Sequence, residues 1–181
     1  FMRTVFEEVA LPCLSGIEAG SVAVLATLVP KKGALTYAET LITFTLENVG
    51  LAGDLILQVD PEHSSNDLIR RVAAKRKART VLRKTPKGSK QSLGYAEGVH
   101  RALEGLTRTY KTQVEIYGNV TIHAENELTT WMIRYAGTVL TNYSIRSDGK
   151  TAHEKLRGAK YISALCMIGE SVWLQTDDKE I

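Results

Sequence analysis

The sequence has few residues of the kinds that would place it in a specialised structural class. Its two cysteines, Cys13 and Cys166, lie far apart and form no CxxC pair, and its four histidines are scattered. These features argue against a disulfide framework and against a zinc module. No apolar run approaches the ~18 residues of a membrane helix, and no signal peptide opens the chain. We therefore expect no membrane association and a location in the nucleus or the cytoplasm.

The sequence also lacks the short motifs that bind nucleotides. Neither GxGxxG nor GxxxxGK[ST] follows a predicted strand, so an α/β enzyme for a small phosphorylated ligand has little support. The 181 residues suit one domain, and a composition of 44% hydrophobic and 24% charged residues suffices for a core. Because the chain begins at Phe1, we expect it to be a piece of a longer protein.

The hydrophobic pattern predicts an α/β protein. Gly20 and Ser21 suit a tight hairpin between the first two strands, Ser64 or Ser65 suits the N-cap of a helix, and Trp131 is expected in the core. A hairpin followed by crossover helices indicates a mixed sheet. The predicted elements, in order, are strands over 9–17 and 21–29, a helix over 36–49, a strand over 55–59, a helix to about 77, a strand over 80–82, and helices over 94–115 and 125–143.

The C-terminal part of the chain has shorter predicted elements than the rest. A turn at Asp148-Gly149 precedes a short helix, HEKLRG, and a further strand, SVWLQ, is predicted from Ser171. We expect residues 1–145 to form the main domain. Residues 146–181 would then be a linker and the start of a small C-terminal β module.

Positive charge is concentrated in one stretch. The net charge is only +3, but RRVAAKRKARTVLRKTPKGSK, residues 70–90, contains ten Lys or Arg and no acid. Such a local field suits a polyanion, although a solvated helix face followed by a basic loop is the plainer interpretation. The residues we expect to contact nucleic acid are Arg70, Arg71, Lys75, Lys77, Arg83, Lys84, Lys87 and Lys90.

Three acids lie where predicted elements begin or end. Asp60 closes the strand LILQV, Glu18 follows the strand over 9–17, and Glu97 lies in the first turn of a long helix. In α/β sheets, sites form at the carboxyl ends of strands. Two divalent metals about 3.5–4 Å apart need several carboxylate oxygens around them, held rigidly by separate elements. The plainer alternatives are a strand-end aspartate for Asp60, a hairpin residue for Glu18 and a helix-dipole partner for Glu97.

The sequence around these acids resembles the catalytic core of retroviral and copia-like retrotransposon integrases. The signature of that family is two aspartates and a glutamate, with roughly thirty-five residues between the last two. The resemblance is best in QVDPEH and TPKGSKQSLGYAEGVHRAL, which begin at Gln58 and Thr85, and it extends to VPKKG, from Val29, and DGKTAHEKLRG, from Asp148. It covers almost the whole chain.

This resemblance implies an RNase H-like mixed sheet flanked by helices, and metal-dependent polynucleotidyl transfer with Mg²⁺ or Mn²⁺. Asp60 and Glu97 would be the second and third metal ligands, and Glu18 stands where the family has its first aspartate. Glu62 is expected to face solvent or DNA. The resemblance implies DNA as the partner and association into homo-oligomers.

Two functions of this fold remain open at the level of sequence. One is an integrase that cuts and joins DNA ends with Glu18, Asp60 and Glu97. The other is a nucleic-acid-binding module that has lost catalysis, since Glu carries one more methylene than Asp and moves its carboxylate by about 1.5 Å. Catalytic groups tolerate about 0.5 Å.

Overall fold

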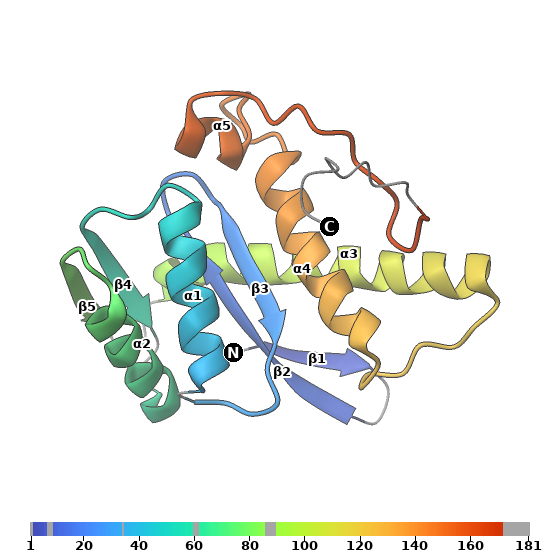
Figure 1. The fold of residues 1–181 in the computed structure, drawn as a ribbon, viewed down its shortest axis with the longest axis horizontal. Coiled ribbons are helices and arrows are strands. Elements are labelled where there is room, and N and C mark those ends of the chain that lie inside the picture. The colour runs from blue at the N-terminus through green and yellow to red at the C-terminus, as the bar shows by residue number, and fades with distance from the viewer. Residues whose placement is uncertain (1, 7–8, 34, 60–61, 86–89, 172–181) are drawn as a thin grey trace, which may run out of the picture.

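The computed structural model describes residues 2–6, 9–33, 35–59, 62–85 and 90–171, and they form a mixed α/β structure (Figure 1). Helices and strands alternate through the middle of the chain and helices follow, as the sequence predicted. The elements are β1 (Met2–Phe6), β2 (Val9–Ile17), β3 (Val24–Leu28), α1 (Thr36–Asn48), β4 (Leu55–Val59), α2 (His63–Lys75), β5 (Thr80–Lys84), α3 (Lys90–Gly118), α4 (Glu127–Asn142) and α5 (Ala152–Arg157).

The first three strands form an antiparallel sheet in the order β1-β2-β3. Ile17 pairs with Val24 beside the hairpin, and Cys13 pairs with Leu28 four residues further along. The predicted hairpin is therefore confirmed. The prediction missed β1, a short strand that pairs along β2, so the strand taken as the first of the sheet is its second.

The remaining strands form a separate parallel pair, β4-β5. Both strand orientations of the expected mixed sheet are therefore present. Within the described residues, however, backbone pairing divides the strands into a three-stranded and a two-stranded sheet.

The two faces of β2 contribute to different parts of the core. Cys13 belongs to a buried cluster with Val99 and Leu103 of α3 and with residues of β3 and α4. Its neighbour Leu14 belongs to a second cluster with residues of α1 and α2. This alternation follows from the two-residue period of a strand. The β2-β3 pair is thus covered on both sides.

Local sequence accounts for several helix ends. Asn126 caps α4 by accepting a bond from Leu128 N–H, and Thr151 caps α5 in a reciprocal arrangement with Glu154. The predicted cap of α2 at Ser64 or Ser65 is wrong. The helix begins at His63, and its cap residue, Glu62, makes no side-chain cap bond.

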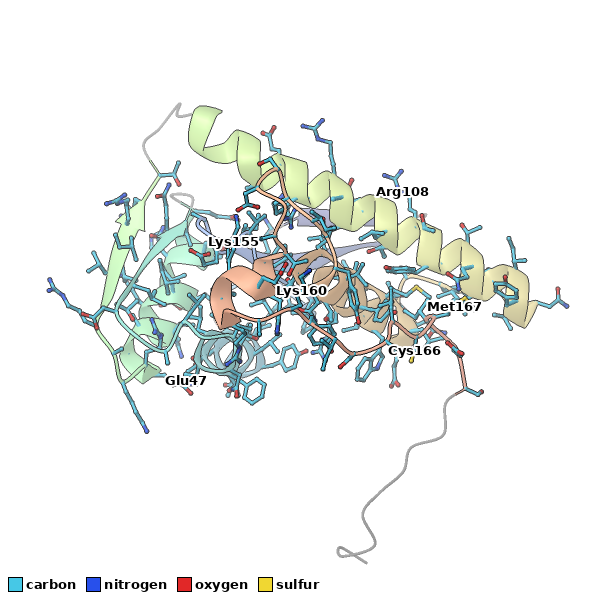
Figure 2. The ribbon with its side chains drawn as sticks, turned by 90° about the horizontal axis from the view of Figure 1, so that it is seen from above. Glu47, Arg108, Lys155, Lys160, Cys166 and Met167 are labelled. Carbon is cyan, nitrogen blue, oxygen red and sulfur yellow. The ribbon has the colours of Figure 1, made fainter. Side chains whose placement is uncertain are left out.

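The stretch after α4 lies against the rest of the protein. Arg157 donates to the Asn48 carbonyl at the end of α1, and Tyr143 O–H donates to the Ser163 carbonyl. Figure 2 shows Lys160, Cys166 and Met167 along the segment that follows α5. The predicted strand over 171–175 falls almost wholly outside the described residues. Of the helices described, none has the length and apolarity needed to cross a bilayer.

Candidate functional site

The carboxylate of Glu18 is held inside the turn between β2 and β3. Its Oε1 accepts a bond from Gly20 N–H at 2.9 Å, and its Oε2 accepts one from Ser21 N–H. The backbone of Glu18 closes the same turn, because its N–H donates to the Ala23 carbonyl and its carbonyl accepts from Val22 N–H. Both carboxylate oxygens thus have partners in the hairpin itself.

These bonds stabilise a strained backbone. Val22 has a φ of 71°, which a β-branched residue rarely adopts. Arg146 adds a weak bond from its guanidinium to the Val22 carbonyl, at 3.4 Å. Partial burial acts to raise the pKa of Glu18, but the bonds from Ser21 and Gly20 outweigh it, and the pKa lies below its usual value. The geometry gives Glu18 a role in the turn.

Glu18 lies at the opposite end of β3 from the end of β4. Lys32, just after β3, forms an ion pair with Glu62, just after β4, at 3.1 Å. The ends of β3 and β4 are therefore together, whereas Glu18 lies beside the start of β3. Figure 1 shows the β2-β3 hairpin at the end of the sheet from which β3 departs. The four residue-to-residue steps from Val24 to Leu28 alone separate the two ends by about 13 Å, so the structure does not bring Glu18 to the end of β4.

The end of β4 is fixed to the end of β5. Thr85 N–H donates to the Val59 carbonyl at 3.0 Å, and Gln58 donates to the buried Thr85 hydroxyl at 3.3 Å. Asp60 follows Val59 directly but lies outside the described residues. Glu62 is exposed, and its hydrogen bond from Lys32 lowers its pKa.

Glu97 is exposed on α3, and its carboxylate makes no ion pair or hydrogen bond with the described residues. One turn later, His100 is half-buried and its Nε2 lies 2.7 Å from Ser15 Oγ of β2. The sequence analysis did not identify this contact, whose serine lies on a face of β2 that is otherwise apolar.

The acids of the described residues do not by themselves assemble a metal centre: no three His, Cys, Asp or Glu among them are grouped to hold an ion. Mg²⁺, however, is commonly bound through one or two carboxylates together with substrate phosphates. Glu97 offers an unengaged carboxylate for that purpose, and Asp60 is the second oxygen donor that the sequence supplies. Glu18 does not fit, because it lies beside the start of β3, whereas the ends of β3 and β4 are together.

Two of the predicted nucleic-acid contacts are engaged within the protein. Lys75 and Arg71 of α2 approach the carboxylate of Glu39 at 2.7 and 3.6 Å. Glu39 is only 4% exposed on α1, and a buried carboxylate requires such partners. Arg71 also lies 3.6 Å from Asp67. These two cations join α1 to α2.

Four predicted cations remain open to solvent. None of them makes an ion pair within the described residues, and they extend from α2 to β5. They are Arg70, Lys77, Arg83 and Lys84. Lys87 lies outside the described residues, and the side chain of Lys90 does too. Arg76, by contrast, is buried and donates to the carbonyls of Leu51 and Gly53.

The prediction that Trp131 belongs to the core is wrong. The residue is 61% exposed on α4, where the Arg134 guanidinium lies 5.8 Å from its ring centroid. The helix instead buries Met132 and Ile133, so Trp131 lies outside its buried face.

The architecture matches solved structures of integrases. The catalytic core of BIV integrase is similar with a TM-score of 0.53 at 19% identity, over 80% of this chain and 84% of that one. A chain of the simian T-cell lymphotropic virus intasome, solved in complex with PP2A regulatory subunit B56 gamma, gives 0.62 at 11% identity, over 98% of this chain. This chain spans 58% of the length of that intasome chain. No protein-family model and no curated protein sequence matches. The chain therefore has the fold of a retroviral integrase catalytic core.

Proposed function

We propose that this domain binds DNA and carries out metal-dependent polynucleotidyl transfer where β4 ends and α3 begins. Asp60 and Glu97 would be the metal ligands. The observation that supports this most is the open carboxylate of Glu97 on a helix anchored to β2, in a chain with the integrase-core fold. Glu18 has no part in this site.

The two carboxylates supply what this chemistry asks of the protein. Phosphoryl transfer depends on positioning and on neutralising the charge of the transferring phosphate, with little covalent chemistry by side chains. Mg²⁺ or Mn²⁺, when bound, supplies that neutralisation and activates the attacking oxygen. Asp60 and Glu97 hold their negative charge on separate elements, at a strand end and on a helix.

The proposed fold in finer detail is RNase H-like, with β1 beside β4 in one five-stranded sheet. Two observations support it. The pair β4-β5 is parallel while β1-β2-β3 is antiparallel, and Leu57 of β4 packs against the cluster that contains Leu14 of β2. The end of β4 then lies near the centre of the sheet, where strand ends are most rigid.

The open cations would hold the DNA backbone. Arg70, Lys77, Arg83 and Lys84 share one charge and are not neutralised by the described residues. Each phosphate neutralised by a cation releases counterions, so binding should weaken steeply with salt. As integrases act in assemblies, we also propose that this chain works as a homo-oligomer.

A second candidate is a nucleic-acid-binding module without catalysis. The placement of Glu18 favours it, because the position that the sequence assigned to the first metal ligand serves the hairpin instead. If Glu18 takes no part in the site, an integrase would have to work with two carboxylates, whereas the integrase signature has three.

A paired assay separates the two candidates. The protein is titrated with a fluorescent DNA duplex at several salt concentrations, and strand cutting is followed in Mg²⁺ and Mn²⁺ with a chelator control. We expect salt-sensitive binding together with metal-dependent cutting that Asp60→Asn reduces on the order of a hundredfold or more. Salt-sensitive binding without cutting would support the binding module, and the absence of both would contradict each candidate.

A further inference from the structure

A single described hydrogen bond joins a side chain of α3 to the sheet. Ser15 Oγ and His100 Nε2 are 2.7 Å apart, although the residues are 85 positions apart in the chain. The other bonds from described α3 side chains stay within the helix or reach the loop after it. The Ser15–His100 bond therefore makes a contact that no other described polar group of α3 reproduces.

The apolar contacts of α3 are less directional than this hydrogen bond. Val99 and Leu103 are buried against Cys13 and its neighbours, and such contacts are favourable over a range of orientations because hydrophobic burial is non-directional. A hydrogen bond requires a specific distance and angle. The bond from His100 thus adds a directional contact between α3 and β2.

The position of the Glu97 carboxylate depends on the rotation of α3 about its own axis. It precedes His100 by three residues, so the two side chains are neighbours on the helix surface. A helix with its side chains is about 10–12 Å across, so a rotation of about 10° moves a side-chain tip by roughly 1 Å. Displacements of about 1 Å in a catalytic site cost on the order of a hundredfold in rate.

The protonation state of His100 suits the contact. Burial lowers its pKa, and the nearby carboxylates of Glu104 and Glu97 oppose that effect only in part. The imidazole is therefore neutral at neutral pH, with one nitrogen donating and the other accepting. The Ser15 hydroxyl can serve as either partner.

We propose that Ser15 and His100 are positioning residues that orient α3 on β2 and thereby place the Glu97 carboxylate for metal binding. This inference rests on the proposed function, since it assigns a role to a bond near the proposed site. It makes neither residue a ligand or a participant in proton transfer.

The test compares variants of each partner. His100→Leu and Ser15→Ala should each lower kcat for strand cutting about a hundredfold while KM for DNA stays unchanged, because the open cations lie on α2 and β5. The double variant should be no worse than either single one, since the bond is already lost. His100→Gln, whose amide can bond to Ser15, should retain most of the rate.

Metal affinity gives a readout independent of turnover. Mn²⁺ binding, followed by electron paramagnetic resonance, should weaken in His100→Leu and be restored in His100→Gln. Thr107→Val is the matched control, because Thr107 is a buried residue of α3 whose hydroxyl, among the described residues, bonds only to the Leu103 carbonyl within the helix. It should leave both the cutting rate and Mn²⁺ binding unchanged.

Helix orientation is measured separately by residual dipolar couplings of the α3 amides. A shift of these couplings in His100→Leu, absent in Thr107→Val, is the expected result. Unchanged couplings, or an active His100→Leu variant, would overturn the inference while leaving the proposed function intact. If the wild-type protein does not cut DNA but α3 still rotates in His100→Leu, the proposed function is overturned. The assignment of Glu97 as a metal ligand is then overturned with it.

Discussion

Lys32 and Glu62 lie 3.1 Å apart and join the chain that leaves β3 to the chain that leaves β4. Because β2 and β3 are antiparallel, this contact also shows which end of β2 faces the proposed site. It is the end at Val9, and the Glu18 hairpin is at the other. The proposed site therefore depends on Asp60 and Glu97.

The ion pair itself should matter little. Both side chains are more than 40% exposed, and exposed pairs contribute about 0–1 kcal/mol. We expect Glu62→Gln to change the free energy of unfolding by less than about 1 kcal/mol and to leave DNA cutting intact. Urea unfolding and the cutting assay check this, and a loss of cutting as large as in Asp60→Asn would make Glu62 a ligand.

Glu18 should stabilise the hairpin in a pH-dependent way. Its folded-state pKa is lowered below the ordinary 4.5, so its contribution is present above that value and is lost as pH falls through the folded pKa. Each hydrogen bond is worth about 1 kcal/mol. Glu18→Gln should therefore be less stable than the wild type at pH 7, and the two should converge on acidification. A difference independent of pH would contradict the hairpin role.

Lys75 and Lys77 should separate stability from DNA binding. Lys75→Ala removes a partner of the buried Glu39 and should cost about 1–3 kcal/mol of stability. Lys77→Ala should change stability by less than about 0.5 kcal/mol but lower the slope of log K against log salt by about 1. Thermal unfolding and salt-dependent DNA titration measure both, and the reverse pattern would reject the assignment of the open cations.

The two cysteines should differ in reactivity. Burial raises the pKa of Cys13 to about 11, so almost no thiolate is present at pH 8, whereas Cys166 is exposed. A chromogenic disulfide reagent should titrate one thiol in the folded protein and two in denaturant. Two fast-reacting thiols in the folded protein would show that β2 is not packed as described.

Long amphipathic segments made the helices predictable. In α2, for example, Leu68, Ile69 and Val72 have the spacing of one helix face, and all three are buried. Strand β1 was missed because Arg3 and Thr4 interrupt its apolar residues, and its identity as a strand depends on pairing along β2. Trp131 was misplaced because composition cannot say which flank of a helix meets the sheet.

The predicted metal ligands show the same limit of prediction from sequence. The sequence shows that Glu18 follows a strand, but the direction of that strand relative to β4 is a property of the sheet. Once β1 precedes β2, the end of β2 lies away from the end of β4. The Ser15–His100 bond joins residues 85 positions apart, so no local pattern could indicate it.

The most direct test of the account compares DNA cutting by Glu18→Gln with cutting by Glu97→Gln, in Mn²⁺ and at a temperature at which both variants are folded. The account predicts metal-dependent cutting by the wild type and by Glu18→Gln, and a loss on the order of a hundredfold or more in Glu97→Gln. Equal loss in both variants would place Glu18 in the metal site and contradict the arrangement of the sheet ends described above.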